Sequence, residues 1–272
     1  MASSSTPANS GKTPKPALRI LCFGNSLTAG YPADNPYGIR LKEKLEEVFP
    51  HFVKGKEKGG KNGGGVEFDV DGVPGDLVAR GSFLGRMESA WQQAEHPYDW
   101  TIVLGGTNDI GWGVDTDQLI EGLKRSWDIP LSKGGKVLAL TIPETKYRSA
   151  KLEESRNKVN DAIRGYKKKN FFHFDLFNAI PYHSMPAGDR PTYWEMDGVH
   201  LTAAGYDLMG EKIAEALVRI LRLAEAQDTE ISEIVTDPRQ RRAIEDLIVE
   251  EERGDHKLLS QGYIIVRKRD LD

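Results

Sequence analysis

Cysteine is almost absent from this chain of 272 residues, in which Cys22 is the only one. A single cysteine excludes an intramolecular disulfide, and its place in an apolar run predicts a core residue rather than a reactive thiol, which needs exposure and a lowered pKa. Metal-ligand spacing is also missing, because the histidines are scattered and only His200 has an acidic partner at a useful spacing. We therefore expect no metal and no cofactor.

Strong net charge and long apolar runs are lacking too. A net charge of −4 creates no field that would gather nucleic acid, and no apolar stretch is long enough to insert into a membrane. Residues 1–17 lack the apolar segment of a secretory signal and are expected to form a disordered tail. With 39% hydrophobic and 29% charged residues, the composition is that of a globular protein, and we expect it to be cytoplasmic.

Apolar runs alternate with helix-period segments, which predicts an α/β fold with a doubly wound parallel sheet. The expected strands cover residues 18–23, 66–71, 100–105, 136–142 and 171–176. The expected helices cover residues 38–49, 80–95, 116–127, 150–168 and 202–223, the last with Thr202 as its N-cap. The glycine-rich stretch 54–65 is expected to be a mobile surface loop.

A candidate nucleophile, Ser26, follows the first of these strands. A serine hydroxyl attacks an acyl carbon when an imidazole takes its proton and a carboxylate orients that imidazole. Far downstream, Asp197 and His200 stand three residues apart and could fill those two roles. The alternative is that Ser26 is only a capping serine in an ordinary turn and that Asp197 only caps the helix that starts near Thr202.

Two further segments are predicted to bring hydrogen-bond donors to the same sheet edge. Asn108 follows the strand at 100–105, and its amide could donate to an oxyanion. Gly75 follows the strand at 66–71, where the lack of a Cβ would let a backbone N–H approach a reacting carbonyl. A turn asparagine and a loop glycine are the simpler explanations for either segment taken alone.

Together the four segments resemble those of the SGNH hydrolases, the GDSL-type esterase and lipase superfamily. Gly24–Thr28 is similar to the nucleophile block, Gly75 to the second-block glycine, Gly106–Asp109 to the Gly-x-Asn-Asp block and Asp197–His200 to the Asp-x-x-His block. The resemblance implies a three-layer, flavodoxin-like α/β/α fold with a five-stranded parallel sheet. It also implies a Ser26-His200-Asp197 triad, and an oxyanion hole made of the Ser26 and Gly75 N–H groups and the Asn108 amide.

One residue departs from that pattern: Asn25 stands where the nucleophile block usually carries aspartate. The α/β-hydrolase fold is the runner-up among serine hydrolases, but its nucleophile motif has glycine where this chain has Thr28. That fold also takes its acid and histidine from separate loops and needs strands before the serine, whereas only about 25 residues precede Ser26. The short Asp197 to His200 spacing therefore favours the SGNH resemblance.

The resemblance implies activity as an esterase on small-molecule esters, and we expect short acyl groups because no hydrophobic lid helix is visible. The sequence leaves open a thioesterase, a lysophospholipase, a carbohydrate acetylesterase or a non-catalytic binding protein on the same scaffold. Trp112, Tyr193 and Trp194 are candidate walls of the substrate pocket, although each could instead pack within its own loop. The predicted domain covers residues 18–223, and residues 224–272 form an extension that could pack on it or join two subunits of a homo-oligomer.

Overall fold

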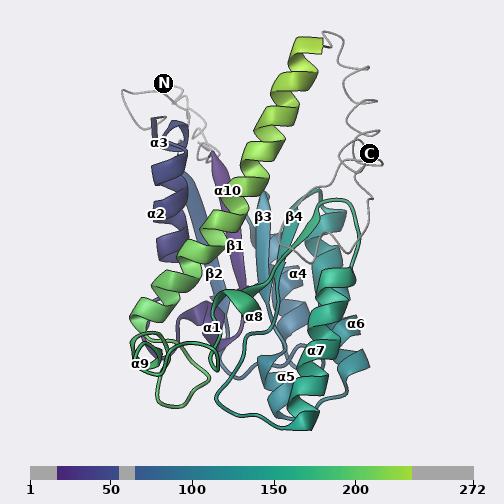
Figure 1. The fold of residues 1–272 in the computed structure, drawn as a ribbon. Coiled ribbons are helices and arrows are strands. Elements are labelled where there is room, and N and C mark those ends of the chain that lie inside the picture. Colours follow the sequence, from purple (N-terminus) through teal and green to yellow (C-terminus); the bar gives the residue numbers. More distant parts are fainter. Residues whose placement is uncertain (1–16, 55–64, 235–272) are drawn as a thin grey trace, which may run out of the picture.

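The computed structural model describes residues 17–54 and 65–234, which form a parallel five-stranded sheet flanked by helices (Figure 1). The spatial order is β2-β1-β3-β4-β5, and every neighbouring pair is parallel. The strands are β1 (Leu18–Gly24), β2 (Val66–Gly72), β3 (Trp100–Leu104), β4 (Lys136–Leu140) and β5 (Phe171–Phe174). This order is that of flavodoxin-like sheets, so the predicted fold class is confirmed.

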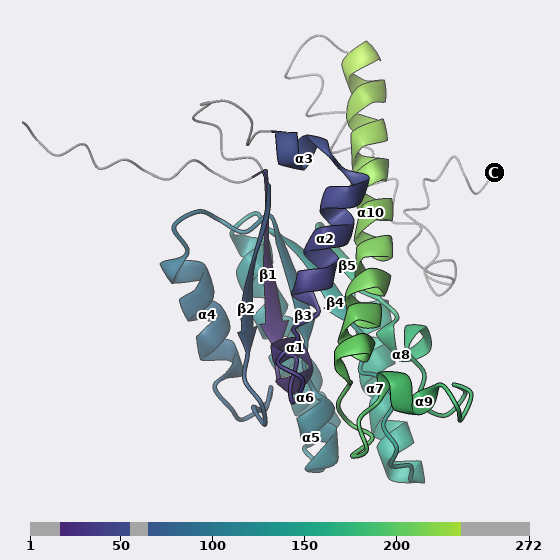
Figure 2. The same ribbon diagram turned by 90° about the vertical axis from the view of Figure 1, so that its left-hand side faces the viewer.

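Helices cover both faces of the sheet because the inner strands are apolar on both sides. In β1, Ile20 and Cys22 face one core, whereas Leu21 and Phe23 face the other. The first core lies under α2 (Gly38–Val48) and α10 (Ala203–Ile234), and the second under α4 (Phe83–Gln93), α6 (Thr116–Ser132) and α7 (Ala150–Gly165). Figure 2 shows α4 on one side of the sheet, with α2 and α10 on the other. Short helices complete the fold: α1 (Ser26–Ala29), α3 (His51–Lys54), α5 (Thr107–Gly111), α8 (Leu176–Ala179) and α9 (Arg190–Tyr193).

Cys22 is fully buried in β1, as predicted, and burial raises its pKa to about 12. None of the helices in the described ranges combines the length and apolar character needed to cross a bilayer.

Several element ends differ from the predicted ones. The strand β4 ends at Leu140 rather than 142, because the Ile142 N–H donates to the Asn160 side chain at 2.7 Å instead of continuing the ladder. The strand β5 ends at Phe174 rather than 176, because Asp175 caps α8. The helix α6 runs past the predicted end at 127 to Ser132 and contains Pro130, which has no N–H to donate to the carbonyl four residues earlier.

The last helix begins where the sequence predicts. The Thr202 Oγ1 accepts a hydrogen bond from the Gly205 N–H at 3.1 Å, which confirms the predicted N-cap. The helix α10 continues to Ile234, so the predicted boundary between residues 223 and 224 falls inside one helix. The expected loop at 55–64 and the extension beyond Ile234 lie outside the described residues.

The strand β1 lies between β2 and β3, so the strand order reverses direction at β1. Crevices at the carboxyl ends of such strands are the usual ligand sites of open α/β sheets, because the loops on either side diverge there. The segments after β1, β2 and β3 meet at this edge and carry Ser26, Gly75 and Asn108, whereas Asp197 and His200 lie on the segment before α10.

Candidate active site

Ser26 is the first residue of α1 and follows β1 after one intervening residue, Asn25. The turn depends on Gly24, because a Cβ at that position would lie 2.3 Å from the Leu104 carbonyl oxygen of β3. The glycine thus allows the ends of β1 and β3 to approach closely. The Ser26 side chain is held in a sheltered position, with 6% of the residue exposed.

A continuous chain of hydrogen bonds joins the three predicted triad residues. The His200 Nε2 lies 2.9 Å from the Ser26 Oγ, and the His200 Nδ1 lies 2.6 Å from the Asp197 Oδ2. The structure therefore brings together residues that are 174 positions apart in the sequence. With the ring proton on Nδ1, Nε2 is free to accept the serine proton, which is the arrangement that a general base requires.

The Asp197 carboxylate is fixed by its own loop. Its Oδ1 accepts the Val199 N–H at 2.8 Å and the His200 N–H at 3.0 Å. Partial burial alone would raise the pKa of Asp197, but these backbone bonds and the His200 ring together hold that pKa below its ordinary value. The carboxylate does not cap α10, because Thr202 fills that position.

The two predicted oxyanion donors flank the serine. Gly75 occupies the third position of the turn Val73–Asp76, with a φ of +79°, and Pro74 precedes it. The Asp76 N–H, and not that of Gly75, closes this turn on the Val73 carbonyl at 3.2 Å, and the positive φ of Gly75 is the conformation that turns with glycine at the third position adopt. The Asn108 amide lies at the start of α5 and donates one of its two N–H groups to the Asp76 carbonyl at 2.9 Å. Its second N–H is left for another acceptor.

The sequence reasoning missed the residues that hold these donors. The Asp76 carboxylate accepts hydrogen bonds from Arg86 at 2.9 and 3.1 Å, and Arg86 also donates to the Gly24 carbonyl at 2.9 Å. The loop after β2 and the end of β1 are thereby tied together. A charged residue within the buried stripe of the predicted helix at 80–95 was the available signal.

Asp109 supports the same loop from the other side. It is fully buried, and its carboxylate accepts the Val78 and Ala79 N–H groups, both at 3.0 Å. Burial raises the pKa of Asp109, although these two backbone bonds act in the opposite direction. The residue therefore anchors the segment after Asp76 to α5, directly beside Asn108.

The three aromatic candidates have different surroundings. Trp112 is 80% exposed, so it does not anchor its loop in the core. Trp194 is buried and packs on Tyr182 with ring centroids 5.2 Å apart, and Tyr193 is partly buried against the same core. Trp112 alone among the three presents its side chain freely to solvent, whereas the loop of Trp194 packs on its own aromatics. Tyr31, which the sequence reasoning did not select, packs edge-on against the His200 ring at 5.0 Å.

A pocket of about 210 Å³ opens beside the candidate triad. Thr107, the neighbour of Asn108, and Val199, the neighbour of His200, line it. Apolar side chains form much of the remaining wall, namely Ile110, Ile142 and Leu152.

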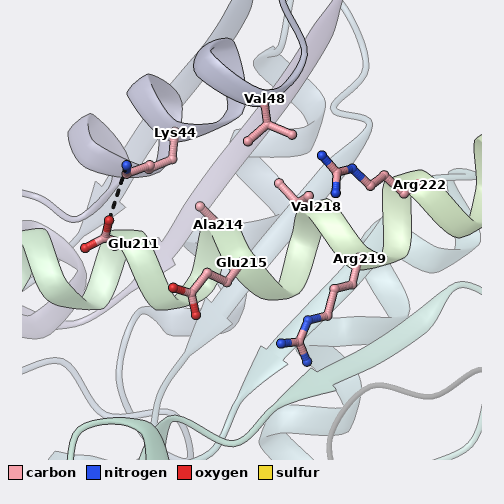
Figure 3. Close-up of a pocket in the computed structure, with 8 residues that line it drawn as sticks. All are labelled: Lys44, Val48, Glu211, Ala214, Glu215, Val218, Arg219 and Arg222. Carbon is pink, nitrogen blue, oxygen red and sulfur yellow. Dashed lines mark ion pairs between the residues drawn. The ribbon is translucent and has the colours of Figure 1, made fainter.

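A separate groove of about 300 Å³ lies between α2 and α10 (Figure 3). Val48 and Val218 face each other across it, and Lys44 of α2 pairs with Glu211 of α10 at 3.3 Å. None of the candidate site residues lines this groove, so it is not part of the candidate active site.

Comparison with known proteins identifies the family of the chain. The family model of the GDSL-like Lipase/Acylhydrolase family matches residues 22–208, and the chain therefore belongs to that family of hydrolases. The match spans all four segments that carry the candidate residues.

Solved structures with the same fold include family members and a carbohydrate esterase. A member of the lipolytic protein G-D-S-L family from Veillonella parvula DSM 2008 is 24% identical, with a TM-score of 0.56 over 75% of this chain and 100% of that chain. A lipase/acylhydrolase from Enterococcus faecalis is 21% identical, with a TM-score of 0.53 over 73% of this chain and 94% of that chain. A carbohydrate esterase family 3 protein from Talaromyces cellulolyticus is 16% identical, with a TM-score of 0.51 over 75% of this chain and 98% of that chain. At these identities the likeness concerns the fold. No curated protein matches the chain.

Proposed function

We propose that this protein is a serine esterase that hydrolyses short-acyl carboxylic esters through an acyl-enzyme intermediate. The observation that carries the proposal is the continuous hydrogen-bond chain from Asp197 through His200 to Ser26, with distances of 2.6 and 2.9 Å. Its position at the carboxyl edge of the sheet, in a member of a hydrolase family, supports the same conclusion.

In the acylation step, the Ser26 Oγ attacks the ester carbonyl carbon while its proton passes to the His200 Nε2. Asp197 is ionised, and it stabilises the imidazolium that forms, holding the ring through Nδ1. Collapse of the tetrahedral intermediate breaks the bond to the alkoxy oxygen, which takes the proton from His200 and leaves as an alcohol. The acyl group remains bonded to Ser26.

In the deacylation step, a water molecule attacks the acyl carbon and gives its proton to the His200 Nε2. The bond between the acyl carbon and the Ser26 Oγ then breaks, and the proton on His200 returns to that oxygen. The carboxylic acid leaves, and the free enzyme is regenerated.

The negative charge of each tetrahedral intermediate develops on the former carbonyl oxygen. We assign its stabilisation to the Ser26 and Gly75 N–H groups and to the free N–H of the Asn108 amide. Donors that are held in place before the reaction stabilise the transition state without reorganising, which makes such groups a large contribution to catalysis. The bond from Asn108 to the Asp76 carbonyl supports this role because it fixes the amide.

The size of the adjacent pocket supports a short acyl group. Its volume of about 210 Å³ is below the roughly 300–1,000 Å³ typical of pockets for larger ligands. Leu152 lies on its wall and is partly buried, so its side chain limits the space available.

Hydrolysis of p-nitrophenyl esters of increasing acyl length tests this proposal. We expect the highest kcat/KM for acetyl to butyryl esters and no turnover by Ser26→Ala, whose fold is checked by circular dichroism. Retained hydrolysis in Ser26→Ala, or a preference for long acyl chains, would contradict the corresponding part of the proposal.

A matched pair of variants tests the acyl pocket separately. Leu152→Ala enlarges the pocket and should shift the preference toward longer acyl groups. Leu221→Ala removes a partly buried leucine on α10, outside the pocket, and should leave the preference unchanged. An equal shift in both variants would mean that the pocket beside Val199 does not hold the acyl group.

A further inference from the structure

The carbonyl oxygen of Asp76 receives two side-chain amides. The Asn25 Nδ2 donates to it from the end of β1, and the Asn108 Nδ2 donates to it at 2.9 Å from the start of α5. A carbonyl oxygen has two lone pairs, so these two bonds fill its capacity. Segments that follow three different strands therefore meet at one acceptor, one residue after Gly75.

Asp76 is itself held firmly. Its side chain is 5% exposed and accepts hydrogen bonds from Arg86 and from the Ser82 N–H, the latter at 2.8 Å. The side chain of Asp76 is therefore anchored to α4 through Arg86, whereas its carbonyl is held by the Asn25 and Asn108 amides.

Asn25 is buried, with 5% of the residue exposed, and its Oδ1 has no hydrogen-bond partner among the described residues. The polar contact of its side chain is thus the donation to Asp76. An ionised carboxylate at this position would place one oxygen against the Asp76 carbonyl and the other in a buried space without a donor. Both contacts are unfavourable, because a carboxylate accepts hydrogen bonds and cannot donate them.

We propose that Asn25 is a positioning residue whose amide fixes the Asp76 carbonyl and, through it, the Gly75 N–H and the Asn108 amide. The aspartate that usually occupies this position in the family is therefore harmful in this chain. This inference rests on the proposed esterase function, and it concerns the geometry of the oxyanion donors rather than the identity of the nucleophile.

The substitution Asn25→Asp gives this proposal a distinctive pH signature. A protonated carboxyl can still donate its O–H to the Asp76 carbonyl, whereas the ionised form cannot. Charged groups reach this region from every surrounding element: Asp71 from β2, Asp76 from the following loop, Arg86 from α4, Asp109 from α5 and the Asp197-His200 pair. Burial and the facing carbonyl favour the protonated form, so the loss of activity should grow as the pH rises.

The test measures kcat and KM for the wild type and Asn25→Asp on a soluble acetyl ester between about pH 5 and pH 9. We expect kcat of the variant to fall by roughly tenfold to a hundredfold at high pH, the scale expected when a catalytic group is displaced by about 1 Å, with KM little changed. The ratio of variant to wild-type kcat should decrease as the pH rises. Taking the ratio at each pH removes the pH dependence that the two proteins share.

Two further variants separate positioning from general damage. Asn25→Ser removes the amide without adding a charge, and it should lower kcat by a factor that does not change with pH. Asn35→Ser is the matched control for Asn25→Ser, because the Asn35 amide also donates to a backbone carbonyl, that of Ala203 at 3.0 Å, and to the Asp207 carboxylate at 2.9 Å, but lies outside the oxyanion donors. The ratio of the control's kcat to the wild-type kcat should stay near one at every pH.

A wild-type kcat in Asn25→Asp, a ratio independent of pH, or a change confined to KM would overturn the proposal. If Asn25→Asp does not fold, Asn25→Ser decides, and unchanged kcat in that variant contradicts the positioning role. A crystal structure of Asn25→Asp at high pH supplies a readout independent of turnover, because the Asp76 carbonyl should turn away from residue 25. An Asp76 carbonyl that keeps its wild-type orientation would overturn the positioning role of Asn25. Failure of the esterase proposal would look different, because ester hydrolysis would then survive in Ser26→Ala.

Discussion

Replacing Asn108 by alanine separates the catalytic role of its amide from its structural one. The wild-type amide donates one N–H to the Asp76 carbonyl at 2.9 Å, and we assign the other N–H to the oxyanion. Asn108→Ala removes both. The Asp76 carbonyl still accepts the Asn25 amide in the variant, so it is not left unpaired.

The two losses differ in size. One neutral hydrogen bond contributes about 1 kcal/mol to the free energy of unfolding, which corresponds to a melting-temperature decrease of about 3 °C in a domain of this size. Removing one oxyanion donor costs about 3 kcal/mol of transition-state stabilisation, or on the order of a hundredfold to a thousandfold in kcat. The variant should therefore be folded and nearly inactive.

Steady-state kinetics on a soluble acetyl ester, together with a thermal melt, check this prediction. KM should change less than kcat, because the charge on the oxygen develops mainly in the transition state. The control Asn178→Ala removes an amide that bonds only within α8 and its cap, and it should retain kcat. A change in Asn108→Ala confined to KM would mean that Asn108 shapes the pocket and does not stabilise the oxyanion.

Three other substitutions have definite expected outcomes. Asp197→Asn should lower kcat/KM at neutral pH by up to about 10⁴-fold, because an amide holds the wrong imidazole tautomer as readily as the right one; wild-type rates would remove Asp197 from the mechanism. In the wild type, the pKa of Asp197 lies below its ordinary value, so this carboxylate stays ionised from mildly acidic pH upward, and a pH profile of kcat/KM should show no loss from its protonation in that range. Asp109→Ala should destabilise the fold by about 2 kcal/mol or more in urea denaturation, because the Val78 and Ala79 N–H groups lose their acceptor; an unchanged midpoint would contradict this. Thr202→Ala should lower stability by about 1 kcal/mol and leave kcat unchanged, and a loss of kcat would indicate that this cap also positions His200.

The sequence predicted the sheet well because buried parallel strands are apolar on both faces. The run at 18–23 and that at 100–105 became β1 and β3 with ends shifted by one residue. Strand and helix ends that depend on distant side chains were predicted less accurately. The Asn160 side chain stops β4, and no local pattern around residue 140 shows that contact.

The site was predictable to the extent that its residues stand at strand ends. Ser26 and Asn108 follow β1 and β3, so a parallel sheet brings them to one edge. The supporting residues could not be predicted in this way, since the contacts of Asp76 with Arg86 and Asn25 exist only in the folded chain. Burial of Trp194 likewise depends on its packing against Tyr182.

Reaction of the intact protein with a fluorophosphonate tests the central claim most directly, because only a serine activated by a neighbouring base reacts with this reagent. Intact-mass measurement followed by peptide mapping should find one adduct per chain, on Ser26, and none in Ser26→Ala. His200→Ala should slow the labelling strongly while leaving the fold intact. An unlabelled wild type, or an adduct on a different residue, would contradict the assignment of Ser26 as the nucleophile.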